Sequence, residues 1–204
     1  MVSAFRENHG HVCSLTHVEI EIGSLESVNT RLRESSPTVV VNTAAMHHVD
    51  ICEREPAAAY AVNAIGVRNL ALVTRDLGAT LIHLSTDYVF DGKKSTPYVE
   101  EDLPLPLNVY GNSKLAGEYY ARTLNPKHFV LRTSALYGKH RCRVKGGRNF
   151  VDLMLELART RGRVRVVDDE FVSPTPTHDL AQQIVCPSRC DSYGLYHATS
   201  ENNC

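Results

Sequence analysis

The feature that most constrains this chain is a regular alternation of short β-branched runs and longer helix-like segments over residues 11–133. The run at 38–43 is apolar throughout its centre, as expected for a strand buried on both faces. Further strand candidates lie at 11–15, 79–85 and 128–133. Alternation of this kind predicts a parallel sheet with helices on both faces, so we expect an α/β, Rossmann-like doubly wound fold.

Helix signals separate these runs. Ser24 is expected to cap a helix that reaches about Arg33, because a serine oxygen can accept hydrogen bonds from the free N–H groups of a first turn. Pro56 suits the first turn of a longer helix that ends near Asp76. A third helix is expected over 113–124.

The composition changes after Gly138, where a basic, glycine-containing stretch at 139–148 predicts a loop. We therefore divide the chain into a larger α/β region, residues 1–138, and a second region, residues 139–204. The elements expected in the second region are a helix capped by Asn149, a strand over 163–167, a helix capped by Thr177 and a strand over 195–198.

Charge and cysteine usage exclude several classes of protein. Lys and Arg number 22 against 23 Asp and Glu, and no basic block is present, so we expect no nucleic-acid partner. No apolar run approaches the roughly 18 residues that cross a membrane, and no secretory signal opens the chain. We expect a cytoplasmic protein with free thiols, and we interpret Cys186 and Cys190 as ordinary loop thiols rather than half of a zinc site.

The most informative pair is Tyr110 and Lys114, which lie one helical turn apart and so face the same side of a helix. An ammonium close to a phenol stabilises the phenolate and lowers a pKa that is ordinarily about 10. Such a tyrosine can pass a proton to a carbonyl oxygen near neutral pH. Ser85 and Thr86 end a predicted strand, and a hydroxyl there can hydrogen-bond the same oxygen. The alternative is an exposed tyrosine beside a solvated lysine, with Ser85 and Thr86 in a turn.

Several blocks of the chain, in the same order, resemble the dTDP-4-dehydrorhamnose reductase family of extended short-chain dehydrogenase/reductases. The blocks are 83–92, 106–118, 132–134 with 136–138, 149–150, 167–169 with 173–175, and 194–198. The resemblance implies an oxidoreductase that transfers hydride from NADPH or NADH to the 4-keto carbon of dTDP-4-dehydrorhamnose and yields dTDP-L-rhamnose. It also implies that residues 1–138 bind NAD(P) and that residues 139–204 are part of a substrate-binding region.

The same resemblance assigns roles to individual residues. Tyr110 is implied to be the general acid, Lys114 to lower its pKa and hold the nicotinamide ribose, and Thr86 to polarise the keto group. The substrate side is implied to include Thr86, Asp87, Tyr88 and Ala135, the last standing where relatives usually carry tryptophan. The cofactor side is implied to include Glu21, Ile22, Asn42, Ala44, Ala45, Tyr110 and Lys114.

Departures from the family pattern leave alternatives open. The family begins with a strand and a Gly-rich turn, and this chain shows neither, so we expect it to be part of a longer enzyme. Tyr88 stands where the related dehydratases carry Glu, which favours carbonyl reduction over dehydration. His47 and His48 are interpreted as loop or cofactor-side residues rather than metal ligands. The absence of an acidic residue at 14–17 leans toward NADPH.

Three other functions remain in competition with this reductase. One is another NAD(P)-dependent sugar-nucleotide epimerase or reductase. The second is a non-catalytic regulatory subunit resembling the β subunit of methionine adenosyltransferase, and the third is a gene remnant. The intact residues Thr86, Tyr110 and Lys114 favour the enzyme. For that enzyme the expected partner is a dTDP-sugar substrate, with no membrane partner, and a homodimer is compatible with the sequence.

Overall fold

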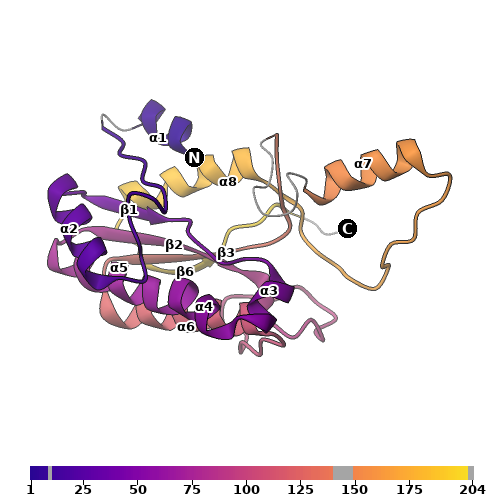
Figure 1. The fold of residues 1–204 in the computed structure, drawn as a ribbon, viewed down its shortest axis with the longest axis horizontal. Coiled ribbons are helices and arrows are strands. Elements are labelled where there is room, and N and C mark those ends of the chain that lie inside the picture. The colour runs from indigo at the N-terminus through magenta and orange to yellow at the C-terminus, as the bar shows by residue number, and fades with distance from the viewer. Residues whose placement is uncertain (9–10, 140–148, 202–204) are drawn as a thin grey trace.

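The structure, a computed structural model, describes residues 1–8, 11–139 and 149–201. These residues form an α/β fold in which a parallel sheet separates two layers of helices (Figure 1). The strand order is β1-β2-β3-β6, and each neighbouring pair is parallel. The four strands are β1 (Val39–Asn42), β2 (Thr80–Thr86), β3 (His128–Thr133) and β6 (Gly194–His197). The predicted parallel α/β architecture is confirmed.

Helices connect the strands as the alternation predicted. In the first region they are α1 (Val2–Asn8), α2 (Leu25–Ser35), α3 (Val49–Arg54), α4 (Pro56–Tyr60), the π-helical turn η1 (Ala61–Ile65), α5 (Gly66–Asp76), the 3-10 turn η2 (Asp87–Val89) and α6 (Val109–Leu124). The second region contains α7 (Phe150–Thr160), α8 (Thr177–Val185) and the 3-10 turn η3 (Pro187–Arg189), besides a small parallel pair, β4 (Leu136–Tyr137) and β5 (Thr175–Pro176).

Two apolar cores lie on opposite faces of the sheet. On one face α2, α5 and α6 cover the strands, and Leu81 of β2 packs among their side chains. On the other face α1 and α8 cover Ile82, the next residue of β2, together with Phe129 of β3. Consecutive strand residues thus enter opposite cores, as the period-two geometry of a strand requires. Helix α7 stands apart from both layers and has no buried residue (Figure 1).

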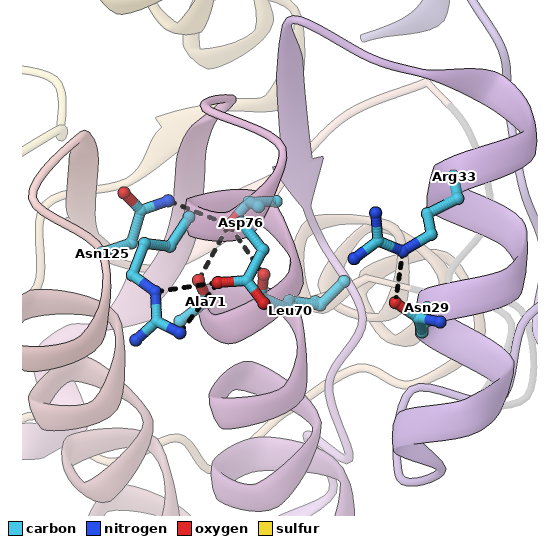
Figure 2. Close-up of polar contacts among 8 residues, drawn as sticks. Asn29, Arg33, Leu70, Ala71, Asp76 and Asn125 are labelled. Carbon is cyan, nitrogen blue, oxygen red and sulfur yellow. Dashed lines mark hydrogen bonds and ion pairs between the residues drawn. The ribbon is translucent and has the colours of Figure 1, made fainter.

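A buried hydrogen-bond network closes the amino-terminal edge of the sheet, opposite the candidate site. The Asn125 amide donates to the Thr74 hydroxyl at 2.9 Å (Figure 2). It also donates to the Ala79 carbonyl at 3.1 Å. Thr74 in turn donates to the Leu70 carbonyl at 2.7 Å. The network connects the residue after α6 to α5 and to the start of β2. It therefore fixes the C-terminal ends of both helices against the sheet.

Three cap predictions can be compared with the structure. Ser24 caps α2 by accepting a hydrogen bond from the Ser27 N–H, and Asn149 caps α7 in the same way, so both are confirmed. The cap of α8 is Pro176 rather than Thr177, which is the first helical residue. Helix α6 begins at Val109, four residues before the predicted start at 113, because the Asn108 side chain accepts a hydrogen bond from the Gly111 N–H at 2.8 Å.

Two predicted strands are wrong. The segments 11–15 and 163–167 do not join either sheet of the described residues. A strand needs a neighbour whose backbone groups it can pair with, and a strand candidate without such a neighbour stays irregular. Val166 and Val167 accordingly remain more than half exposed. Of the loop predicted at 139–148, residues 140–148 lie outside the described residues.

The expectation that no apolar segment approaches the length of a membrane span is wrong for one continuous helical run. Residues 56–76, formed by α4, η1 and α5, reach 21 residues and are apolar enough by length and composition to cross a membrane. More than half of the 18-residue window that meets this test is buried inside the protein. Its side chains Val67 and Leu70 belong to the core between α2 and α6, so the run is a core helix here.

Candidate active site

The carboxyl ends of β1, β2 and β3 meet at one edge of the sheet because the strands are parallel. Asn42 is in register with His83, and Thr86 is in register with Thr133. Helix α6 begins at the same edge and carries Tyr110 in its first turn. This is the edge where open parallel sheets bind ligands. The structure therefore brings the predicted Thr86, Tyr110 and Lys114 region together.

Tyr110 sits against the end of β2. Its phenol is hydrogen-bonded to the Thr86 side chain, and the Tyr88 ring meets it edge-on with centroids 5.5 Å apart. Gly111 permits this close approach, since a Cβ there would collide with the Tyr88 carbonyl oxygen. Burial raises the pKa of Tyr110 to about 12, which outweighs the lowering by Thr86. The expected lowering by Lys114 is therefore not seen in the chain alone, and Tyr110 is protonated at neutral pH.

Lys114 lies beneath the site, one turn along α6, and is only 2% exposed. Its Nζ donates a hydrogen bond of 2.5 Å to the Leu84 carbonyl and lies 3.4 Å from Nε2 of His83. Burial lowers the pKa of Lys114 to about 8, against an opposing effect of the Glu118 carboxylate. The amine is buried, yet it keeps most of its charge at neutral pH. These contacts direct the amine toward β2.

Asp87 is held rigidly beside the phenol. Thr86 Oγ1 donates to one carboxylate oxygen of Asp87 at 3.0 Å, and Ser134 Oγ donates to the other at 2.6 Å. The Tyr88 N–H donates to Thr86 Oγ1 at 3.2 Å. Thr86 is thus fixed between a carboxylate and Tyr110, and the nearby charge of Asp87 adds to the raised pKa of that tyrosine.

Asn63 connects the loop after β1 to helix α6 by hydrogen bonds. Asn42 Oδ1 accepts a hydrogen bond from the Ala44 N–H at 3.1 Å. Asn63, inside the π-helical turn, accepts from the Met46 N–H and donates to the Met46 carbonyl, both at 2.9 Å, and also donates to Ser113 Oγ at 2.9 Å. π-helical turns are frequent at functional sites. Here the turn fixes the loop that the cofactor was expected to touch.

A buried ion pair supports this helix from the sheet. Arg132 of β3 makes two hydrogen bonds to the Glu118 carboxylate, at 2.9 and 2.7 Å, and both side chains are at most 3% exposed. Ser85 of β2 adds a third, at 2.6 Å. Charge-assisted, two-pronged contacts of this kind fix geometry as well as adding energy. They fix the position of α6, and therefore of Tyr110 and Lys114, relative to strands β2 and β3.

Some predicted site residues lie outside this hydrogen-bonded group. Ile22 belongs to the core beside α5, and Glu21 accepts a hydrogen bond from the Gly23 N–H at 2.8 Å. Ala45 is partly buried in the loop after β1, whose neighbour Ala44 is exposed. Ala135 is exposed after β3 and has a left-handed backbone with φ of 42°.

Sequence reasoning missed the roles of His83, Ser134 and Asn63. A signal existed for His83, which interrupts the apolar run 81–84, whereas a serine or asparagine in isolation carries little signal. Ser134 donates a hydrogen bond to Asp87, which is 47 residues away in the chain.

The histidine and cysteine predictions can be placed as well. His47 and His48 lie in the loop before α3, as interpreted. Cys13, Cys52, Cys186 and Cys190 are free thiols, while Cys142 and Cys204 lie outside the described residues. Within the described ranges, no group of three or more His, Cys, Asp or Glu side chains is placed to hold a metal ion.

Comparison with known proteins adds a family match and close relatives. The model of the family described as RmlD substrate binding domain matches residues 1–204. A dTDP-4-dehydrorhamnose reductase of Sinorhizobium fredii is 39% identical over 91% of this chain and 63% of its own length. A dTDP-4-keto-6-deoxy-D-glucose reductase of Streptomyces niveus is 40% identical over 98% of this chain and 68% of its own length. The chain thus spans about two thirds of the length of these curated relatives.

Solved structures of dTDP-4-dehydrorhamnose reductases share the fold of this chain. A dTDP-4-dehydrorhamnose reductase from Clostridium acetobutylicum superposes with a TM-score of 0.91 at 37% identity, covering 98% of this chain and 70% of that one. A Bacillus anthracis dTDP-4-dehydrorhamnose reductase in complex with NADP gives 0.91 at 36% identity, covering 99% and 71%.

Proposed function

Because the chain belongs to the RmlD substrate-binding-domain family, we propose that it carries the reductase site for dTDP-4-dehydrorhamnose, whose 4-keto group becomes the alcohol of dTDP-L-rhamnose. The reductant is NADPH or NADH, and the Bacillus anthracis relative in complex with NADP favours the phosphorylated form. The observation that carries the proposal is the Thr86–Tyr110 contact above a buried Lys114, at the edge where the strands end.

Tyr110 supplies the proton. The nicotinamide, when bound, provides the hydride that adds to C4 as the carbonyl π bond breaks. The Tyr110 O–H gives its proton to the resulting oxygen and becomes phenolate. A pKa raised to about 12 keeps this phenol protonated before the reaction, as an acid must be. Thr86 lies beside the phenol, and its hydroxyl can donate to the same oxygen if it turns away from the Asp87 carboxylate, which accepts its hydrogen in the chain alone.

Lys114 serves the proposed reaction from beneath. Its charged amine favours the phenolate that proton transfer leaves on Tyr110. The Leu84 carbonyl accepts a hydrogen bond from one N–H of the Lys114 ammonium. The ammonium carries three N–H groups, so others can donate to the hydroxyls of a cofactor ribose. The donor set present therefore fits a nicotinamide nucleotide.

The remaining assignments extend this site outward. We place the cofactor along Glu21, Ile22, Asn42, Ala44 and Ala45, with residues 1–138 as the NAD(P)-binding region. The sugar lies toward Asp87, Tyr88 and Ala135, with residues 139–204 as part of the substrate region. The rigid hold on Asp87 by Ser134 supports the first of these substrate contacts. A cytoplasmic location belongs to the same proposal.

The experiment follows NADPH absorbance with dTDP-4-dehydrorhamnose. It uses the 204-residue chain and a chimera in which this chain replaces the matching part of the Sinorhizobium fredii reductase. Tyr110→Phe should reduce turnover of the chimera by about 10²–10⁴-fold, the usual contribution of a general acid. Tyr119→Phe is the matched control, since Tyr119 lies on the same helix and is 52% exposed. Equal turnover of the wild-type and Tyr110→Phe chimeras would reject the proposal.

A further inference from the structure

His83 lies beneath Lys114 in the middle of β2, and the proposed reaction gives it no role. The ring is fully buried. Its Nδ1 is 3.1 Å from the Asn42 amide nitrogen, and its Nε2 is 3.4 Å from Lys114 Nζ. A polar ring in an apolar strand interior needs partners for both nitrogens, and here these partners come from β1 and α6.

The contacts around Asn42 fix which nitrogen of His83 carries the proton. The Ala44 N–H donates to Asn42 Oδ1, so the amide oxygen faces the loop and the NH₂ group faces His83. An NH₂ group can only donate, and therefore Nδ1 of His83 must accept. Burial, and then the charge of Lys114, hold the pKa of His83 well below its usual range, so the ring is neutral. A neutral imidazole that accepts at Nδ1 carries its hydrogen on Nε2.

We propose that Asn42 and His83 are positioning residues for Lys114: Asn42 locks His83 in the Nε2–H tautomer, and this N–H group faces the Lys114 amine. A charged Lys114 then meets one acceptor, the Leu84 carbonyl, and one opposing donor. A neutral Lys114 would instead accept the hydrogen bond from Nε2. The pair therefore favours loss of the Lys114 proton.

Other groups act on the same amine, and they define what the pair adds. Glu118, one turn farther along α6, favours the charged form, but its carboxylate is already bound by Arg132 of β3. Tyr110 lies one turn before Lys114 and is neutral at ordinary pH. The tautomer of His83 thus works with burial and against Glu118. One consequence rests on the proposed function. As pH rises through about 8, Lys114 loses its charge, and its support for the Tyr110 phenolate fades.

The tautomer is measured directly, without activity. Imidazole nitrogen resonances of the ¹⁵N-labelled 204-residue chain are assigned to His83 by their loss in His83→Gln. We expect a protonated Nε2 and an unprotonated Nδ1 throughout the range of about pH 5–8, where ordinary histidines titrate. A proton on Nδ1, or a charged ring near neutral pH, overturns the proposal. If His83→Gln fails to fold, the ring is assigned instead by its nuclear Overhauser contacts with the Asn42 amide and the Lys114 side chain, so the wild-type spectrum still decides.

A second measurement tests the effect on Lys114. In Asn42→Ala the donor to Nδ1 is gone, so Nε2 becomes free to accept from the ammonium. The Lys114 titration, followed by its ¹³Cε resonance, should move up by about one pH unit, the scale of one hydrogen bond to a charged group. Thr123→Ala, at an exposed position of the same helix as Lys114, is the control and should leave the His83 tautomer and the Lys114 titration unchanged. An unmoved Lys114 titration in Asn42→Ala contradicts the proposal. If His83 shows the expected tautomer but the chimera has no turnover, only the proposed function is rejected.

Discussion

Replacing Lys114 by methionine tests the cost of burying its amine. The pKa of Lys114 falls from 10.5 to about 8 in the folded chain. Between these values the unfolded chain binds more protons than the folded one, so stability must rise with pH across this window. Each pKa unit corresponds to about 1.4 kcal/mol, so the buried charge destabilises the fold by about 3 kcal/mol at neutral pH. Methionine has a similar shape and no charge, and it removes this penalty.

The assay is urea unfolding followed by far-ultraviolet circular dichroism, with the wild type and Lys114→Met compared at each pH. Loss of the hydrogen bond to Leu84 lowers the variant's stability by about 1.5 kcal/mol, so we expect a net gain of about 1–2 kcal/mol near pH 7. The stability difference should then shift against the variant by about 2–3 kcal/mol toward pH 10. Tyrosine ionisation cancels in this comparison.

Lys127→Met is the control for this prediction. Lys127 also donates to a backbone carbonyl, that of Gly78 at 3.1 Å, but its side chain is exposed. The same chemical change there should give a difference in stability that does not follow pH. If the Lys114→Met difference is equally flat, the reasoning about the buried amine is refuted.

Three further substitutions probe the support of the site. Glu118→Ala leaves Arg132 buried and unpaired and should destabilise the fold by about 3–5 kcal/mol in urea unfolding; a loss below 1 kcal/mol would contradict the buried pair. Gly111→Ala forces a Cβ against the Tyr88 carbonyl and should reduce reductase turnover of the chimera; unchanged kcat would speak against this packing. Ala135→Gly relieves a left-handed backbone and should raise stability by about 1 kcal/mol, whereas a loss would argue against the strain.

Local pattern and topology were enough to predict where the main site residues would lie. Once strand and helix alternate, parallel strands place Asn42 and Thr86 at one edge, and the four-residue spacing puts Lys114 beneath Tyr110. The cap at Ser24 was equally predictable, because it depends on neighbours in the chain.

Properties set by distant contacts were not predictable. The run at 11–15 has strand composition, but composition cannot show whether another strand lies beside it. Spacing alone also gave the wrong direction for the pKa of Tyr110, because burial and Asp87 outweigh the effects that lower it. The tautomer of His83 depends on an asparagine 41 residues away, whose own orientation depends on the Ala44 N–H.

The central claim is tested most directly by following the hydride itself. The chimera is given dTDP-4-dehydrorhamnose and NADPH doubly deuterated at nicotinamide C4, and the product is examined by mass spectrometry and NMR. The account predicts dTDP-L-rhamnose with deuterium on sugar C4, formed about 10²–10⁴-fold more slowly by Tyr110→Phe. A product without deuterium at C4, or labelling that is equally fast in Tyr110→Phe, would contradict it.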